Sequence, residues 1–196
     1  MDTDTIAAYD AGAADYAADW EDGQPPPDDL YAALTEFFRP GPSVDIGCGS
    51  GRDTAWLQAQ GFRALGVDAS AGLLAEAARR HPCVRFVRDT LPGLATLASG
   101  GFANVLCETV IMHLPAASAE AAVRRLADLL ASGGTLYLSW RVTPEEDLRD
   151  EAGRLYAAFG TELVRGALAG LDILLDEEIV SASSGRIVHR IAARKG

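Results

Sequence analysis

Three glycines stand at alternate positions just after a short apolar run. Gly47, Gly49 and Gly51 follow the segment 44–46, Val-Asp-Ile, which reads as a buried strand. Glycine has no side chain and adopts positive φ angles, so a ligand can lie directly against the backbone of such a turn. If a helix follows, the free N–H groups at its start favour a carboxylate or another anion. The pattern predicts a ligand site at the end of this strand.

The residue after the third glycine narrows the choice of ligand. The dinucleotide fingerprint G-x-G-x-x-G needs a glycine at its sixth position, where this chain has Arg52. The Gly-Lys-Ser/Thr ending of a phosphate-binding loop is also missing from this turn. Both observations count against a pyrophosphate ligand. An NAD-dependent oxidoreductase stays open as an alternative because it shares the strand, the turn and the acid described next.

That acid is Asp68, at the end of the next predicted strand, residues 62–67. In parallel sheets of this kind an acid at this position can accept hydrogen bonds from both hydroxyls of a ribose. The alternative is a solvated turn aspartate that caps the helix after Ser70. The spacing from the glycine turn favours the ribose interpretation.

His113 is the candidate general base. It lies on the loop after the predicted strand 102–107, and parallel sheets bind ligands beyond the carboxyl ends of their strands. The alternative is a structural histidine whose ring bonds a neighbouring backbone group. His81 and His189 are weaker candidates, because one precedes a proline and the other lies in the last predicted strand. No histidine or carboxylate cluster has the spacing of metal ligands, so no metal is expected.

Alternating strands and helices must position these residues. The pattern of apolar residues predicts strands at 44–46, 62–67, 84–87, 102–107 and 135–140, with helices ending near residues 38, 61, 80 and 131. Such alternation implies parallel strands joined by right-handed crossovers.

The pattern changes after residue 142. Thr143-Pro144-Glu145-Glu146 is typical of a capping box and predicts a helix to about Phe159, and Thr161 is expected to cap a shorter helix. The β-rich runs 171–181 and 186–193 predict a hairpin. The sheet is therefore expected to have seven strands, the last of them antiparallel.

Composition excludes several classes of protein. The 196 residues fit one domain, 1–196. A net charge of −11 offers no positive surface for nucleic acid or an anionic membrane. The three cysteines form no disulfide or metal pattern, which suits a reducing cytoplasm. The N-terminus does not resemble a signal peptide, and no apolar run is long enough to span a membrane.

Five segments, in order, resemble the motifs of class I S-adenosylmethionine-dependent methyltransferases. The run 44–51 is similar to their first motif, and 66–70 to their second strand with its ribose-binding acid. The segments 88–90, 105–115 and 133–138 resemble the parts after the third strand, at the fourth strand and before the fifth. The likeness covers residues 28–141, and the C-terminal part fits by pattern only. It implies an α/β, Rossmann-like three-layer sandwich with S-adenosylmethionine as cofactor.

The resemblance also implies roles for individual residues. The methionine part of the cofactor would be lined from the glycine turn, the ribose held by Asp68, and the adenine met by Ala69, Asp89 and Thr90. Glu108 and Thr109 would lie near the sulfonium. Arg52 departs from the simplest glycine-rich pattern and is either a cofactor contact or a surface residue. The turn residues meant here are Asp45, Gly47, Cys48 and Gly49.

The segment 1–27 precedes this core, 28–196, across a proline-rich linker. Tyr9, Tyr16 and Trp20 recur in it at roughly helical spacing, and in many members of the resembled family such a segment closes over the cofactor. The alternative is an ordinary amphipathic helix packed on the sheet. Tyr9, Tyr16, Trp140 and Arg141 are the candidate substrate contacts, although the last two could equally be rim residues.

The sequence thus predicts methyl transfer to a small-molecule acceptor. Neither a separate substrate domain nor a basic face is evident, so a nucleic-acid acceptor is disfavoured. Oxygen, nitrogen and sulfur acceptors all stay open. A non-catalytic module that binds the same cofactor is a further alternative.

Overall fold

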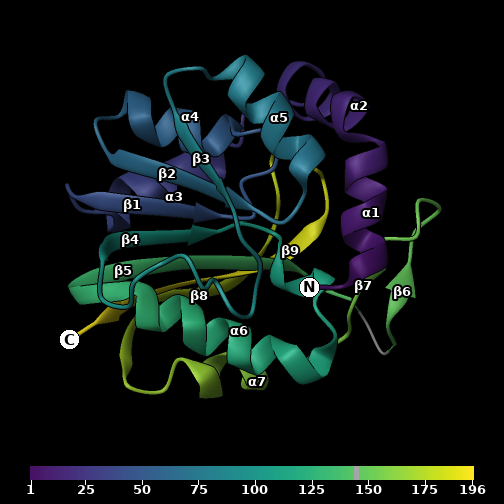
Figure 1. Cartoon of the computed structure of the whole chain (residues 1–196). Helices are drawn as coiled ribbons and strands as arrows, with labels where there is room; N and C mark the ends of the chain where they lie inside the picture. Colours follow the sequence, from purple (N-terminus) through teal and green to yellow (C-terminus); the bar gives the residue numbers. More distant parts are fainter. Residues whose placement is uncertain (144–145) are drawn as a thin grey trace.

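A seven-stranded sheet forms the centre of the molecule. The computed structural model describes residues 1–143 and 146–196, and its large sheet has the strand order β3-β2-β1-β4-β5-β9-β8 (Figure 1). The first five strands pair in parallel, and β9 runs antiparallel to both of its neighbours. The predicted fold class is confirmed, including the antiparallel final strand. The strands are β1 (Pro42–Ile46), β2 (Arg63–Asp68), β3 (Arg85–Arg88), β4 (Phe102–Cys107), β5 (Leu130–Arg141), β8 (Leu171–Val180) and β9 (Ile187–Lys195).

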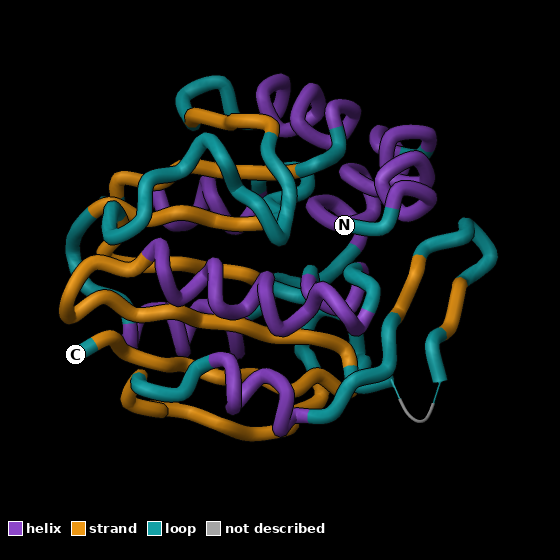
Figure 2. The backbone as a smooth tube through the Cα atoms, turned by 60° about the horizontal axis from the view of Figure 1, so that its bottom comes forward, coloured by secondary structure: helices purple, strands orange, loops and turns teal. Residues whose placement is uncertain are grey.

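Helices cover both faces of this sheet (Figure 2). The helices of the core are α3 (Asp28–Phe37), α4 (Arg52–Ala59), α5 (Ala71–Arg80), α6 (Ala116–Leu129) and α7 (Thr161–Ala167). Side chains alternate between the faces along each strand. Leu136 and Leu138 of β5 therefore pack in the cluster that contains α6 and α7, whereas Tyr137 between them packs in the cluster of α3 and α4. This alternation produces the three layers.

The predicted helix from 143 to 159 is wrong. Residues 148–149 and 155–156 form a two-stranded hairpin, β6 (Leu148–Arg149) and β7 (Leu155–Tyr156), and Pro144 and Glu145 of the predicted capping box lie outside the described residues. Asp150 sets the turn, because its Oδ1 accepts hydrogen bonds from the N–H groups of Ala152 and Arg154. Gly153 supplies the required left-handed backbone, with φ +84°.

Two other boundaries differ from expectation. Strand β5 begins at Leu130 instead of 135, so the glycine pair that was expected to end the preceding helix lies inside the strand. Thr161 is the first residue of α7, and Gly160 occupies the cap position without a side-chain hydrogen bond.

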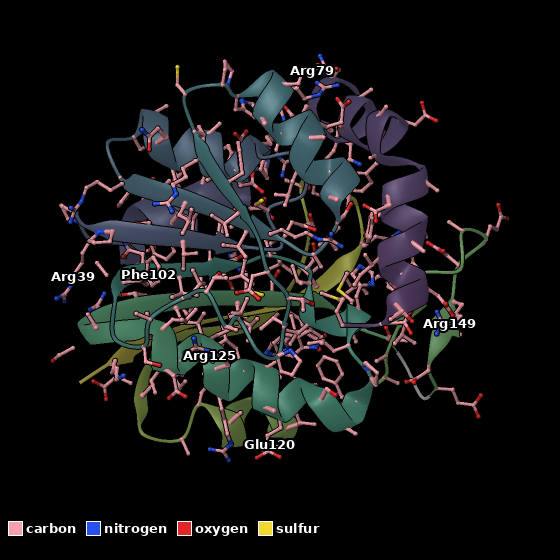
Figure 3. The ribbon with its side chains drawn as sticks, in the orientation of Figure 1. Arg39, Arg79, Phe102, Glu120, Arg125 and Arg149 are labelled. Atoms are coloured by element: carbon pink, nitrogen blue, oxygen red, sulfur yellow. The ribbon has the colours of Figure 1, made fainter. Side chains whose placement is uncertain are left out.

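The N-terminal segment crosses the end of the sheet at which the parallel strands finish (Figure 1). It consists of α1 (Thr3–Ala11), α2 (Ala13–Ala18) and a π-helical turn, η1 (Asp19–Gly23). Asp10 holds it to the core, because Oδ1 accepts hydrogen bonds from Ser70 Oγ at 2.6 Å and from the N–H of Gly72 at 2.8 Å. At its start, Asp2 pairs with Arg149 of the β6–β7 hairpin at 2.9 Å (Figure 3). In the described ranges, no helix is long and apolar enough to cross a membrane.

Candidate active site

A cavity of about 900 Å³ lies between the carboxyl ends of the parallel strands and the N-terminal segment. Both the core and residues 1–24 contribute to its wall. Most of the residues predicted from the sequence line it: Tyr9, Tyr16, Asp45, Gly47, Cys48, Gly49, Asp68, Ala69, Asp89, Thr90, Glu108, Thr109, His113 and Arg141. The structure thus brings together residues that are as far as 132 positions apart, from Tyr9 to Arg141.

Two predicted residues, Arg52 and Trp140, are not among the residues that line the cavity. Trp140 is only 2% exposed and stacks on His189, because strand alternation turns it to the core face while Arg141 faces the cavity side. Arg52 pairs with Asp53 at 2.9 Å and lies 4.6 Å from the centre of the Trp20 ring. Arg52 therefore braces the N-terminal segment from behind the cavity wall.

The glycine turn is held open by backbone geometry. Gly47, Gly49 and Gly51 have φ angles of +76°, +54° and +90°, which side-chain-bearing residues adopt rarely. A Cβ on Gly47 would overlap the side chain of Val110. The N–H of Gly47 donates to the carbonyl of Val67 on β2 at 2.7 Å. The turn therefore needs glycine for both its conformation and its packing.

Asp68 joins the turn to strand β2. Its Oδ2 accepts a hydrogen bond from the N–H of Gly49 at 2.9 Å, and its Oδ1 accepts one from the N–H of Ser70 at 2.8 Å. Burial raises the pKa of Asp68, and these two backbone hydrogen bonds oppose the rise. Ser70, rather than Asp68, caps α5, since its Oγ accepts from the N–H of Leu73. Each oxygen of Asp68 retains a second acceptor position for a ligand hydroxyl.

Asp89 organises the loop after β3. Its Oδ2 accepts hydrogen bonds from the N–H and the Oγ1 of Thr96, and its Oδ1 accepts from the N–H of Thr90. Partial burial raises the pKa of Asp89, but these hydrogen bonds outweigh burial and leave the pKa lowered. Arg125 of α6 donates to the carbonyls of Gly93, Leu94 and Leu97 in the same loop (Figure 3).

Two further carboxyl groups belong to the cavity wall, of which Asp45 is buried and Glu108 is half-buried. Burial raises the pKa of Asp45 to about 8, with a further rise from nearby Asp53 and an opposing hydrogen bond from Thr54 at 2.6 Å. Burial also raises the pKa of Glu108 to about 7, against the hydrogen bond that its Oε2 accepts from Ser139 Oγ at 2.5 Å. At neutral pH a cation in the cavity would favour the ionised form of both carboxyl groups.

Thr109 follows Glu108 with an unusual backbone. Its φ of +53° lies in the left-handed region, which non-glycine residues occupy at a cost. The N–H of Thr109 donates to both Oγ and O of Ser139. The end of β4 is therefore fixed to β5 next to Glu108.

His113 is held on both sides of its ring. Nδ1 lies 2.5 Å from the carbonyl oxygen of Leu155, which can only accept, so Nδ1 carries the proton. Nε2 then accepts the hydrogen bond from the hydroxyl of Tyr9 at 3.1 Å. Burial lowers the pKa of His113, which favours this neutral form. With Tyr9 in place, Nε2 has no lone pair for a substrate proton, and the geometry matches the structural alternative.

Three aromatic rings of the N-terminal segment contact one another in a row at the cavity. The ring of Tyr9 meets that of Tyr16 edge-on at 5.2 Å, and Tyr16 stacks on Trp20 at 5.6 Å. His81 and Glu21 add a contact at 3.0 Å between α5 and the π-helical turn. In this arrangement the segment covers the cavity.

Among the residues that the sequence did not predict, three shape the site. Asp10 carries no motif, and its role follows only from its contacts with Ser70 and Gly72. Arg154 and Tyr156 line the cavity from the β6–β7 hairpin, and the sequence pattern had assigned both to a helix. In the described ranges no group of three or more potential ligands could hold a metal ion.

The seven-stranded sheet and the glycine turn are typical of S-adenosylmethionine-dependent methyltransferases. Solved structures of such enzymes have a similar fold. The structure resembles that of an S-adenosylmethionine-dependent methyltransferase from Anabaena variabilis, with a TM-score of 0.73, 19% identity, and 97% and 95% of the two chains covered. It also resembles a Burkholderia thailandensis 1,6-didemethyltoxoflavin-N1-methyltransferase, solved with 1,6-didemethyltoxoflavin and S-adenosylhomocysteine bound. That likeness has a TM-score of 0.66 and 23% identity, with 93% and 86% of the chains covered.

Sequence comparison finds a family match for the part of the chain that contains the glycine turn. Residues 44–134, which contain the glycine turn, Asp68 and His113, match the family model of the methyltransferase domain. A trans-aconitate 2-methyltransferase of Methylobacterium nodulans is 35% identical over 131 residues, 65% of this chain and 48% of the relative. The chain thus spans about half the length of that curated relative. Residues 44–134 are thus similar to a methyltransferase domain, and the whole chain has the fold of an S-adenosylmethionine-dependent methyltransferase.

Proposed function

We propose that this protein transfers a methyl group from S-adenosylmethionine to a small-molecule acceptor. The observation that carries the proposal is one cavity in which the glycine turn, the half-buried carboxylate of Asp68 and the aromatic N-terminal segment meet. The family match and the small-molecule substrates named for the relatives support it.

The residues present fit the cofactor. The glycine turn leaves an open cradle, because a Cβ added to Gly49 would have only the Tyr16 ring nearby, at 3.7 Å. Asp68 is half-buried there with acceptor positions left over, as a ribose diol requires. Asp89 and Thr90 stand at the end that would receive the adenine, and Glu108 and Thr109 at the end that would receive the sulfonium.

When bound, S-adenosylmethionine supplies a methyl carbon that is already activated by its sulfonium. The protein's task is then mainly to hold donor and acceptor in line. Asp45 and Glu108 present carboxyl groups that a nearby cation would ionise, while Tyr9 and Tyr16 exclude water from the cavity. His113 acts as a base only in a state in which Tyr9 has left Nε2.

The charge of the chain and its cysteines bear on its binding partners and its cellular compartment. A net charge of −11 argues against nucleic acid and anionic membranes as partners. Cys48, Cys83 and Cys107 are all free thiols, which supports the cytoplasm as the compartment.

Binding and turnover together test the proposal. Calorimetry with S-adenosylmethionine, S-adenosylhomocysteine and NAD is expected to show one-to-one binding of the first two and none of NAD. A panel of small acceptors with methyl-labelled cofactor is then expected to give a labelled product. Binding without turnover over a broad panel would favour the non-catalytic module, and NAD binding would favour the oxidoreductase.

A further inference from the structure

The cavity has a second end, of different character from the cofactor end. Its lining includes Arg141, Arg154 and Arg186, together with the Tyr156 ring. The whole chain has 17 lysines and arginines against 28 acidic residues, and at this end three arginines line the cavity alongside two acids, Asp150 and Glu151. The cofactor end is lined by Asp45, Asp68, Asp89 and Glu108.

Arg141 is the arginine best placed to meet a ligand. It ends strand β5, is half-buried, and its guanidinium lies 5.0 Å from the centre of the Tyr156 ring. Among residues 1–143 and 146–196 it forms no ion pair, although it also lines a second cavity of about 210 Å³. A half-buried guanidinium that pairs with no carboxylate of the described residues is suited to bind a ligand carboxylate through two parallel hydrogen bonds.

The neighbouring charges are already matched. Arg154 pairs with Asp150 at 2.7 Å and lies 5.1 Å from the centre of the Tyr9 ring. Asp150 in turn accepts backbone hydrogen bonds within its own hairpin turn, so its charge is compensated there. Glu151 and Arg186 also line the cavity, and both are exposed, where solvent screens them.

We propose that the methyl acceptor is a small molecule bearing a carboxylate, and that Arg141 binds this carboxylate above the ring of Tyr156. This inference rests on the proposed function for the place of the acceptor. In this arrangement the carboxylate of the acceptor lies at the end of the cavity next to the β6–β7 hairpin. The acceptor atom that receives the methyl group then lies on the side of Glu108.

Ligand pairs that differ only in charge test the proposal. The full chain saturated with S-adenosylhomocysteine is titrated calorimetrically with trans-aconitate, succinate and cinnamate, and with the neutral amide of each. At least one acid is expected to bind saturably and at least tenfold more tightly than its amide. Arg141→Gln is expected to weaken that acid at least tenfold, and Arg141→Lys less, because lysine keeps the charge and loses the planar fork.

Arg63→Gln is the matched control. Arg63 is exposed at the opposite, amino end of β2, and its loss changes the net charge equally. The proposal is overturned if no acid binds, if the amides bind as well as the acids, or if both glutamine variants lose equal affinity. Failure to bind S-adenosylhomocysteine would contradict the proposed function instead, and titrating the unloaded chain with the acids would still decide the arginine site.

Discussion

Asp68 is the residue through which the cofactor site depends on the fold. Its carboxylate fixes Gly49 of the turn and Ser70 before α5, and its remaining acceptor positions face the cavity. One side chain therefore sets the shape of the site and would also contact the ligand.

Asp68→Asn is expected to weaken binding of S-adenosylmethionine and S-adenosylhomocysteine alike. The amide keeps one acceptor oxygen but loses the charge-assisted hydrogen bonds, a loss of about 1–3 kcal/mol. Isothermal titration of both ligands measures the change. The alanine variant is expected to lose at least as much, and unchanged affinity in both variants would contradict the assigned role.

The raised pKa of Glu108 predicts that the protein's preference for S-adenosylmethionine over S-adenosylhomocysteine depends on pH. The pKa of about 7 in the empty cavity means that Glu108 gains its negative charge as the pH rises from 6 to 8. Only S-adenosylmethionine carries the sulfonium charge, so its advantage over S-adenosylhomocysteine should increase about tenfold across this range. Parallel titrations at pH 6, 7 and 8 measure the ratio. In Glu108→Gln the ratio is expected to rise less than in the wild type, because Asp45 still gains charge in this range, and equal profiles in the two proteins would disprove the effect.

At the scale of elements, the cover over the cavity depends on a few polar contacts. The N-terminal segment is tied down by Asp10 at Ser70 and by the hydroxyl of Tyr9 at His113. Such contacts can open locally without unfolding the sheet.

Tyr9→Phe tests the cover. The variant removes the donor to Nε2 of the buried His113 and should cost about 0.5–1.5 kcal/mol locally. Hydrogen exchange is therefore expected to speed up in α1 and α2 while the protection of β4 and β5 is retained. Tyr31→Phe is the control, because it removes a comparable hydrogen bond, to Asp53, outside the segment. Equal acceleration in both variants would argue against a separately opening cover.

The fold could be read from the sequence where local and tertiary preferences agree. Alternating apolar runs gave the seven strands, and the glycines at 47, 49 and 51 gave the turn, because each feature is set by nearby residues. The helix predicted up to Phe159 failed because Asp150 and Gly153 form a tight turn that the helical spacing did not reveal.

The site was predictable only in part, for the same reason. Asp68 and His113 were expected at the site because parallel strands finish at one edge, and both line the cavity. Arg154, Tyr156 and Asp10 reach it through a misread hairpin and through the packing of a separate segment. Trp140 was predicted to contact substrate, but side chains alternate along β5. Trp140 therefore lies on the same face as the buried Leu136 and Leu138.

At the scale of the whole molecule, the acidic cavity makes stability depend on pH. Burial raises the pKa of Asp45 to about 8, well above its value in the unfolded chain, so the folded state holds a proton that the unfolded state has lost. Folding stability from this group therefore falls as the pH rises from about 4 to about 8. His113 has a lowered pKa and acts in the opposite sense, but its contribution is complete by about pH 6.5.

Asp45→Asn isolates this contribution. Between pH 6.5 and 8 the wild type should lose about 1.5 kcal/mol of unfolding free energy relative to the variant. The comparison uses the difference between the two proteins because Met1, whose ammonium pKa is lowered by burial, contributes a slope of the opposite sign to both. Urea unfolding at three pH values measures it. Parallel pH profiles would show that Asp45 is ionised throughout.

The central claim is that a single nucleoside-bearing ligand spans the glycine turn and Asp68 beneath the N-terminal segment. A crystal structure of the full chain with S-adenosylhomocysteine tests it most directly. The account predicts the ribose hydroxyls within hydrogen-bonding distance of Asp68 and the amino-acid part against Gly47 and Gly49. A ligand bound elsewhere, or a ribose that leaves Asp68 uncontacted, would contradict it.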